Sequence, residues 1–276
     1  MRIDAHGLTF EVHADGPDDG EAVLLLHGFP QHSGEWVDLL PALHAAGLRT
    51  YALDQRGYSP GARPAAVEAY RLAECVADAV AVLDALDVPA AHVVGHDWGA
   101  IVAWALAAGH PDRVRTLTAV SVSHPAAMAR TIAGDRRQKA RSAYMGLFRK
   151  EGTAEKVLLA WQAAALRKLL GGVGNRERID TYVRPMREPG ALTAALNWYR
   201  AMSGRELVAT GPVSVPTTYV WSDGDTAVGR TAAEACAAYV TGPYRFVELT
   251  GVSHWIPDEA PGALAEAVLA QVEAVR

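Results

Sequence analysis

The feature that most constrains the fold of this chain is a five-residue motif, Gly-His-Asp-Trp-Gly, at residues 95–99. A β-branched run precedes it at residues 91–94, and an apolar stretch follows it at residues 100–106. Glycines on both sides of the central residue permit a sharp, strained turn from strand to helix, because larger neighbours would collide with the backbone. The motif therefore predicts a β-strand, a tight turn carrying Asp97 and an α-helix.

The central residue of such a turn is placed to act as a nucleophile, and here it is an aspartate. A serine would need a base to remove its proton, whereas Asp97 is ionised at neutral pH and can attack saturated carbon directly. The predicted product of that attack is an alkyl ester on Asp97. An aspartate after a strand also commonly caps the following helix, so this interpretation needs support from the rest of the chain.

Length and charge limit the class of protein. With 276 residues, the chain is long enough for an α/β domain with one insertion. A formal net charge of −5, without basic clusters that alternate with aromatic residues, argues against a nucleic-acid partner. The chain shows neither an apolar secretory signal nor the roughly 20 apolar residues that span a bilayer, so we expect a cytoplasmic protein without a membrane partner. Cys75 and Cys236 lack metal-ligand spacing and are expected to be buried thiols.

Short apolar strands alternate with helical segments, as expected for a mostly parallel sheet with helices on both faces. A hairpin around Gly7 opens the pattern. The predicted strands are residues 9–14, 22–26, 48–53, 91–94, 116–122, 215–221 and 245–249, and the main predicted helices outside the insertion are residues 34–46, 71–86, 100–106 and 261–275. Between the predicted strands at residues 116–122 and 215–221 the pattern is helical, with glycine-rich breaks at 171–174 and 189–190. We therefore predict a core of residues 1–124 and 209–276 with a helical cap, residues 125–208.

In an open parallel sheet, ligands bind at the carboxyl ends of the strands, so polar residues directly after predicted strands are site candidates. Asp97, Asp225 and His254 follow three such strands in the order nucleophile, acid and histidine. His254 is the candidate base that activates water, and Asp225 is the candidate acid that orients it. Asp223 follows the same strand as Asp225 and is the alternative acid.

Four motifs together resemble the α/β-hydrolase-fold epoxide hydrolases and their dehalogenase relatives. These are His-Gly-Phe-Pro at 27–30, Asp-Gln-Arg-Gly-Tyr-Ser at 54–59, Gly-His-Asp-Trp-Gly at 95–99 and Ser-His-Trp at 253–255. The resemblance covers nearly the whole chain and implies an eight-stranded, mostly parallel sheet with a cap over the active site. It also implies an oxyanion hole formed by the backbone N–H groups of Phe29 and Trp98, and no metal or organic cofactor.

Within this superfamily the leaving group distinguishes one enzyme class from another, and we expect the cap to supply the side chains that protonate or bind the leaving group. Residues 196–200, Leu-Asn-Trp-Tyr-Arg, resemble the cap motif whose tyrosine holds the epoxide oxygen, and residues 142–148 resemble the segment with the second tyrosine. The resemblance thus implies Tyr199 and Tyr144 as proton donors to the epoxide oxygen. Aromatic packing in the core is the alternative role for both. The segment after residue 148, Arg-Lys-Glu-Gly, departs from the glutamine and proline-glycine expected there.

A largely apolar pocket is expected beneath the cap. Pro30 and Trp198 are the predicted substrate-pocket residues. Other cap side chains that could face the pocket, depending on helix register, are Met145, Leu147, Trp161 and Leu166. The expected partners are a small apolar epoxide and water, and a homo-oligomer is left open.

The predicted function is an epoxide hydrolase that forms a vicinal diol, with two alternatives. A haloalkane or haloacid dehalogenase would use the same Asp97. Haloalkane dehalogenases usually bind the halide with an asparagine directly after the His-Gly pair, where this chain has Phe29, or with a tryptophan in the cap. Fluoroacetate-type dehalogenases have an arginine directly after the nucleophile, where this chain has Trp98. A catalytically silent protein that binds a small apolar ligand is the second alternative. An esterase or lactonase is disfavoured, because Asp97 would form an anhydride with an ester.

Overall fold

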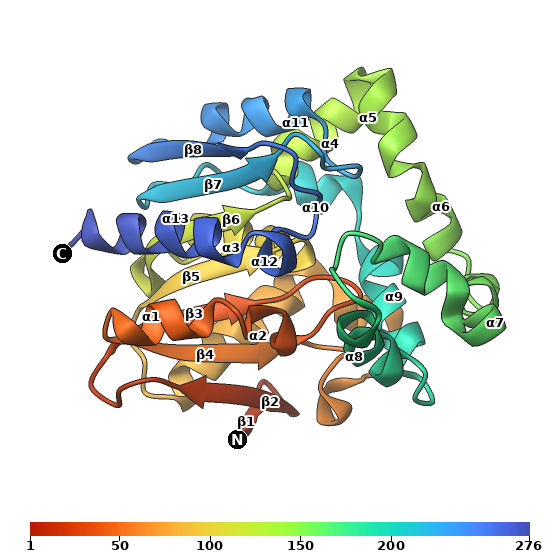
Figure 1. Cartoon of the computed structure of the whole chain (residues 1–276), viewed down its shortest axis with the longest axis horizontal. Helices are drawn as coiled ribbons and strands as arrows, with labels where there is room; N and C mark the ends of the chain where they lie inside the picture. Colours follow the sequence, from red (N-terminus) through yellow and green to blue (C-terminus); the bar gives the residue numbers. More distant parts are fainter.

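An eight-stranded sheet runs through the computed structural model, which describes residues 1–276 (Figure 1). Its strands are β1 (Arg2–Ala5), β2 (Leu8–Asp15), β3 (Glu21–Leu26), β4 (Leu48–Asp54), β5 (Ala91–His96), β6 (Val114–Val120), β7 (Thr217–Ser222) and β8 (Tyr244–Leu249). They lie in the order β1-β2-β4-β3-β5-β6-β7-β8. The pairs β1–β2 and β2–β4 are antiparallel and all other neighbours are parallel, which confirms the predicted mostly parallel sheet.

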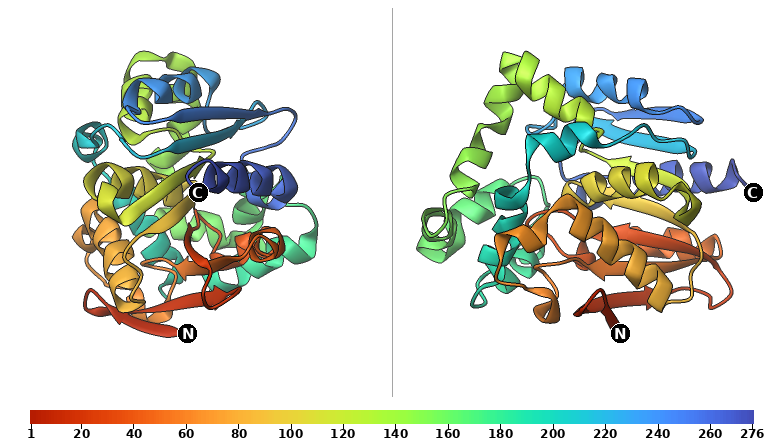
Figure 2. Two further views of the ribbon diagram at one scale, coloured as in Figure 1. Left: turned by 90° about the vertical axis from the view of Figure 1, so that its left-hand side faces the viewer. Right: turned by 180° about the vertical axis from the view of Figure 1, so that it is seen from behind.

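Helices cover both faces of the sheet (Figure 2). On one face lie α1 (Leu40–Ala45) and α13 (Pro261–Glu273), and on the other lie α2 (Leu72–Ala85) and α3 (Trp98–Gly109). Every residue of β5 and β7 is consequently buried, whereas β8, at the edge, has no fully buried residue. Burial on both faces is why the central strands read as continuous apolar runs instead of alternating patterns.

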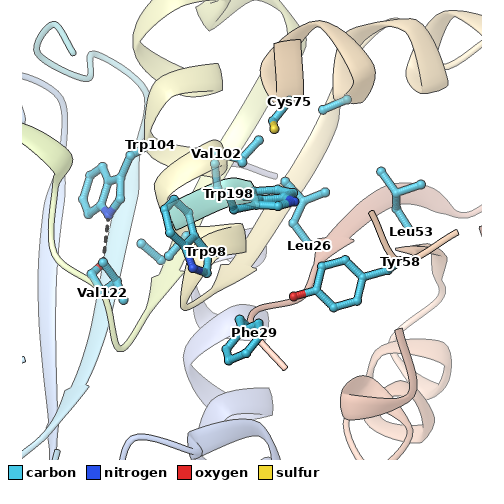
Figure 3. Packing of buried hydrophobic residues seen from close by; sticks show 14 of the residues in the cluster. Leu26, Phe29, Leu53, Tyr58, Cys75, Trp98, Val102, Trp104, Val122 and Trp198 are labelled. Atoms are coloured by element: carbon cyan, nitrogen blue, oxygen red, sulfur yellow. Dashed lines mark hydrogen bonds between the residues drawn. The ribbon is translucent and has the colours of Figure 1, made fainter. Parts of the chain in front are cut away.

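The larger of two hydrophobic cores continues from α2 and α3 to the inserted helices, and aromatic side chains dominate it near the elbow (Figure 3). Trp98 packs edge-on against Trp198, with ring centroids 5.5 Å apart. Deeper in the core, the Trp104 indole N–H donates a hydrogen bond of 3.2 Å to the backbone carbonyl of Val122. The contact between Trp98 and Trp198 packs the insertion against the first turn of α3.

The α-helices between β6 and β7 come from the segment predicted as the cap, residues 125–208, except that the last of them ends one residue later. They are α4 (Pro125–Gly134), α5 (Arg136–Arg141), α6 (Met145–Phe148), α7 (Thr153–Leu169), α8 (Arg176–Met186), α9 (Ala191–Ala201) and α10 (Gly204–Ala209). In Figure 1, α5 to α9 lie beyond the carboxyl ends of the parallel strands. The insertion therefore covers the edge of the sheet where the site candidates lie.

Both predicted glycine-rich breaks separate helices of the insertion. Asn175 begins α8, where its side chain accepts a hydrogen bond from the Arg178 amide, and Gly190, with φ of 78°, begins α9. Helix α7 has an unexpected bend at residues 160–163, where Trp161 has φ of 47°. Trp161 is 91% exposed, so it is not one of the cap side chains that face the pocket.

Residues 34–46 do not form the single helix predicted from their composition. A 3₁₀ turn, Ser33–Trp36, is followed by a break and then by α1. Pro41 stands in the first turn of α1, where a missing N–H is harmless, but it could not donate to residue 37 within one continuous helix. Proline also delays the start of β7, because Pro216 cannot donate to the ladder.

Two further expectations concern the thiols and the membrane. Cys75 and Cys236 are both buried and unpaired, as predicted. None of the helices combines the length and the apolar character that crossing a bilayer requires.

Candidate active site

Asp97 occupies a strained turn between β5 and α3, with φ of 51° and ψ of −115°. A non-glycine residue in this region costs on the order of 1–3 kcal/mol and persists only where its surroundings enforce it. The flanking glycines are required by space: a Cβ on Gly99 would lie 1.9 Å from the Leu26 carbonyl oxygen, and one on Gly95 would lie 2.3 Å from the Gly99 carbonyl oxygen. The turn thus presents the Asp97 side chain at the carboxyl edge of the sheet.

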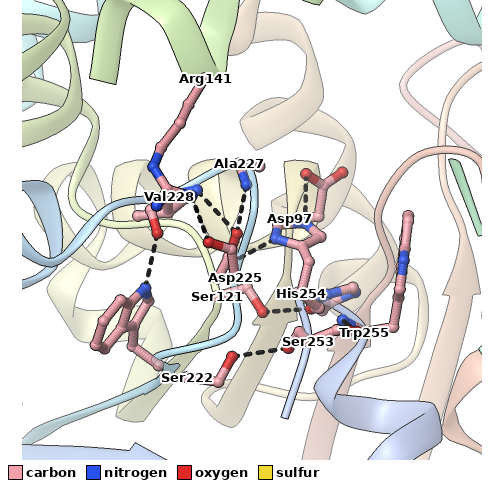
Figure 4. Close-up of polar contacts among 12 residues, drawn as sticks. Asp97, Ser121, Arg141, Ser222, Asp225, Ala227, Val228, Ser253, His254 and Trp255 are labelled. Carbon is pink, nitrogen blue, oxygen red and sulfur yellow. Dashed lines mark hydrogen bonds and ion pairs between the residues drawn. The ribbon is translucent and has the colours of Figure 1, made fainter. Parts of the chain in front are cut away.

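The structure brings the three predicted triad residues together (Figure 4). His254 Nδ1 lies 2.7 Å from Asp225 Oδ2, and His254 Nε2 lies 3.3 Å from Asp97 Oδ2. The second oxygen of Asp225 accepts hydrogen bonds from the amides of Ala227 and Val228, at 2.7 and 2.8 Å. Asp225 is therefore held in place by its own loop as well as by the histidine.

Asp223, the alternative acid, lies elsewhere. Its carboxylate accepts a hydrogen bond from the Gly251 amide at 2.7 Å, and its side chain is exposed. Directly after β7 the chain forms a tight turn, in which the Asp225 N–H donates a hydrogen bond to the Ser222 carbonyl. This turn brings the Asp225 carboxylate, and not that of Asp223, to face His254.

The charges of the triad reinforce one another. Burial alone would lower the pKa of His254, but the charges and hydrogen bonds of Asp225 and Asp97 outweigh it and raise the pKa to about 10. Burial alone would raise the pKa of Asp97, yet its contact with His254 and the hydrogen bond from Phe29 lower it below its ordinary value. Near neutral pH the site therefore holds an imidazolium between two carboxylates.

One of the two predicted oxyanion-hole groups already contacts Asp97. The Phe29 amide donates a hydrogen bond of 2.8 Å to Asp97 Oδ1. Trp98 is the first residue of α3, so its N–H has no acceptor within the helix and lies at the positive end of the helix dipole. The Phe29 N–H is thus in contact with the carboxyl, and the Trp98 N–H belongs to the residue that directly follows Asp97.

Tyr144 and Tyr199 come from different parts of the insertion and meet above Asp97. Tyr199, on α9, is 3% exposed, whereas Tyr144, in a 3₁₀ turn after α5, is 36% exposed. Their ring centroids are 6.3 Å apart. Burial raises the pKa of both phenols above the ordinary value, and the charge of Asp97 adds to the effect, so both remain protonated donors.

Two cavities meet at these residues. The first, of about 190 Å³, is lined by Phe29, Pro30, Asp97, Arg141, Tyr144, Leu169, Tyr199, Thr226, Ala227, His254 and Trp255. The second, of about 60 Å³, is mostly apolar and is lined by Asp97, Trp98, Ile101, Val122, Met128, Ile132, Ser142, Tyr144, Met145, Tyr199, Met202, Leu207, Ala227 and Val228. Asp97 and both tyrosines line each of the two cavities. A reacting group held between Asp97 and the tyrosines could therefore extend one substituent into each cavity.

The predicted pocket residues divide into those that line a cavity and those that do not. Pro30 and Met145 each line one. Trp198 lines neither, because its indole N–H donates to the Arg56 carbonyl at 2.8 Å and its ring packs behind Trp98. Leu166 is also buried in the hydrophobic core away from both cavities. The assignment of Trp198 to the substrate pocket was therefore wrong.

A buried pair that the sequence did not single out lies beneath the triad. Glu35 and His96 are both fully buried, with Glu35 Oε2 3.2 Å from His96 Nδ1. Burial, together with the charges of Asp258 and Asp97, holds the pKa of Glu35 well above its ordinary value, and burial lowers the pKa of His96 to about 4. The contact is therefore a hydrogen bond between a neutral acid and a neutral imidazole. The sequence carries no distinct signal for this pair, since Glu35 and Asp38 both lie close to Trp36 and only one of them is buried.

Comparisons with known proteins agree with this geometry. A family model for the alpha/beta hydrolase fold matches residues 21–261. The chain is 30% identical to epoxide hydrolase A of Mycobacterium tuberculosis, over 97% of this chain and 95% of that protein. It is 31% identical to the AB hydrolase superfamily protein YfhM of Bacillus subtilis, again over 97% of this chain and 95% of that protein.

A solved structure extends the likeness to three dimensions. Epoxide hydrolase A from Mycobacterium thermoresistibile superposes with a TM-score of 0.87 at 27% identity, covering 99% of this chain and 97% of that one. The chain therefore belongs to the α/β-hydrolase fold family and, within it, to the epoxide hydrolases.

Proposed function

We propose that this protein hydrolyses an epoxide to a vicinal diol through a covalent ester on Asp97. One observation carries the proposal: the ionised Asp97 carboxylate and the protonated phenols of Tyr144 and Tyr199 line the same two cavities. An epoxide needs both groups at once, a nucleophile at carbon and a proton donor at oxygen. The names of the relatives support the same reaction.

In the first step, Asp97 Oδ2 attacks an epoxide carbon and the ring C–O bond breaks. Asp97 Oδ1, which accepts the Phe29 hydrogen bond, becomes the carbonyl oxygen of the ester. The epoxide oxygen takes a proton from one of the two tyrosines, which leaves a tyrosinate. Attack from the side opposite the leaving oxygen inverts the carbon.

Ester formation changes the electrostatics at His254. The charge of Asp97 helps to hold the pKa of His254 at about 10, and the ester is neutral, so that pKa falls once the ester has formed. The imidazolium can then return a proton to the tyrosinate. This leaves neutral His254, the form that acts as a base.

In the second step, His254 takes a proton from water while the water oxygen attacks the ester carbonyl carbon. Asp225 stabilises the imidazolium that forms, and the amides of Phe29 and Trp98 stabilise the oxyanion. Collapse of the tetrahedral intermediate breaks the ester C–O bond to the substrate carbon chain. The departing alkoxide takes the proton of the hydroxyl that came from water, which releases the diol and leaves the Asp97 carboxylate beside the His254 imidazolium. The cap, residues 125–208, supplies the tyrosines and limits access of bulk water.

Intact-mass measurement of a His254→Gln variant tests this proposal. The variant is exposed to a mixture of epoxides and alkyl halides, because the loss of the base should stall the cycle at the ester. An adduct with the mass of a whole epoxide is expected, and an Asp97→Asn/His254→Gln double variant should show none. An adduct with the mass of an alkyl halide minus HX would identify a dehalogenase, and no adduct from any compound would contradict the covalent route.

Isotope labelling tests the second step. In a single turnover in ¹⁸O-labelled water, the label should enter Asp97, while the first diol formed should carry unlabelled oxygen from Asp97. Label in the first diol would indicate direct attack of water on the epoxide.

A further inference from the structure

Arg141, the last residue of α5, is the one Lys or Arg side chain that lines the cavity containing Asp97 and His254. It lies three residues before Tyr144 in the chain. The remainder of this cavity is made of apolar groups, the two phenols and Thr226. Arg141 is also exposed to solvent, so its side chain lies where this cavity meets bulk water, and its guanidinium is accessible to a ligand that enters.

The hydrogen bonds of Arg141 leave most of its donors free. Arg141 Nη1 donates to the Asp225 backbone carbonyl at 2.7 Å, and no Asp or Glu carboxylate lies within ion-pair distance of the guanidinium. A guanidinium has five N–H donors in a planar fork that matches a carboxylate. The charge of Arg141 is therefore anchored but not neutralised.

Holding the loop after Asp225 does not require Arg141, because Gln138 on the same helix already does so. Gln138 Oε1 accepts a hydrogen bond from the Gly229 amide at 2.8 Å, and its Nε2 donates to the Ala227 carbonyl at 2.7 Å. The neutral Gln138 is buried and makes both of these contacts to the backbone. The loop is therefore held by Gln138 as well as by Arg141, and the remaining N–H donors of Arg141 are available to a ligand.

The helix that carries Arg141 is positively charged, which favours the approach of an anionic substrate. Helix α5 reads Arg-Arg-Gln-Lys-Ala-Arg and has no acidic residue, in a chain whose formal net charge is −5. The Asp97 carboxylate repels an anionic substrate, and an unpaired guanidinium in the same cavity offsets that repulsion. Because Arg141 is exposed, water and salt screen an ion pair formed there, and its strength should fall as ionic strength rises.

The two cavities would hold different parts of a bound substrate. On the far side of the tyrosine pair, the apolar cavity of about 60 Å³ has room for no more than a short hydrocarbon group. On the other side, the cavity of about 190 Å³ leads to Arg141. We propose that Arg141 is a specificity-determining residue that selects small epoxides carrying a carboxylate, bound as a bidentate ion pair. This inference rests on the proposed epoxide hydrolase activity and names its substrate class.

Matched substrates that differ in charge alone test the inference. The comparison uses an epoxyhexanoate and the corresponding epoxyhexanamide, with kcat and KM measured for the wild type, Arg141→Met and Arg141→Lys. The wild type should prefer the acid, and Arg141→Met should lower kcat/KM for the acid by about 5- to 30-fold, mainly through KM, because charged hydrogen bonds are lost at a site that solvent partly screens. The amide should change by less than about 3-fold, and Arg141→Lys should recover part of the preference.

Two control variants separate recognition from loop support. Arg137→Met removes a charge from the exposed side of α5 and should leave the preference for the acid unchanged. Gln138→Ala loosens the loop and should affect acid and amide equally. If Arg141→Met also lowers both substrates equally, or if the wild type does not discriminate between them, the inference is wrong.

Failure of the proposed function would look different. The proposed activity is tested separately by adduct formation in His254→Gln, and if neither epoxide is hydrolysed, binding of hexanoate and hexanamide to the unmodified protein decides the role of Arg141. Preferential binding of hexanoate that disappears in Arg141→Met would establish a carboxylate site. Equal binding of the two compounds would overturn it.

Discussion

His96 Nε2 lies 3.0 Å from the backbone carbonyl oxygen of His254, so the neighbour of the candidate nucleophile also supports the candidate base. Ser121 donates a second hydrogen bond of 2.7 Å to the same carbonyl. On its other side, the His96 ring contacts the carboxyl of Glu35. A neutral, buried chain of hydrogen bonds thus joins the segment after β3, the elbow and the loop after β8.

Replacement of Glu35 by Gln tests whether this carboxyl is neutral. Because the folded pKa of Glu35 is raised, its protonated form stabilises the native state at low pH, and that contribution falls as pH rises above the unfolded value of about 4.3. The amide has no such loss. We expect the free energy of unfolding of Glu35→Gln, relative to wild type, to increase by up to about 1.4 kcal/mol per pH unit above pH 5. Urea unfolding at several pH values measures it.

A second variant at the same position provides the comparison. Glu35→Ala leaves a cavity and an unpaired His96, so it should be less stable than wild type throughout the pH range. The raised pKa of His254 affects all three proteins and cancels in the differences. A Glu35→Gln difference that does not vary with pH would show that the carboxyl is ionised in the native state.

The pKa of His254 should report the charge of each neighbouring carboxylate. Asp225 is the larger cause of the value of about 10 and Asp97 the smaller, so Asp225→Asn should lower the pKa more than Asp97→Asn does. We expect a fall of at least about one unit for Asp97→Asn, which also imitates the neutral ester. NMR titration of the His254 ring measures both variants. An unchanged pKa in Asp97→Asn would remove the proposed trigger for base catalysis.

The two tyrosines should act on formation of the ester and not on its hydrolysis. A positioned proton donor contributes about 100- to 10,000-fold to rate, and two phenols can partly replace each other. Tyr199→Phe and Tyr144→Phe should each slow adduct formation in a His254→Gln background by about 10- to 100-fold, and the double variant should lose most of the remaining rate. Time-resolved intact mass follows the adduct. A normal rate in Tyr144→Phe would leave Tyr144 with a packing role.

A buried ion pair in the second motif should affect stability more than chemistry. Arg56 Nε donates to Asp78 Oδ2 at 2.6 Å, and both side chains are no more than 5% exposed. Asp78→Asn leaves the Arg56 charge unpaired and should destabilise the fold by about 3–5 kcal/mol, measured by urea unfolding. The exposed pair Arg230–Glu248 is the matched control, and Glu248→Gln should destabilise the fold much less, because water and salt screen an exposed ion pair. Similar losses at both sites would contradict the role assigned to burial.

Sequence alone was sufficient for the sheet and for the positions of the candidate triad. Asp97, Asp225 and His254 could be predicted because the carboxyl ends of parallel strands meet at one edge, so position after a strand determines location. The elbow was predictable for a local reason, since the clash at Gly99 arises within one short turn and its supporting strand. These features depend on periodicity, spacing and backbone sterics, which a sequence displays directly.

Tertiary structure decided which side chains face the cavity. Trp198 and Tyr199 are adjacent on α9, yet Trp198 packs behind Trp98 while Tyr199 faces Asp97, because helix register is set by packing against the core. Neither the pairing of Glu35 with His96 nor the position of Arg141 has a local signature. Each joins segments far apart in the chain, and its energy comes from burial and charge that exist only once those segments have met.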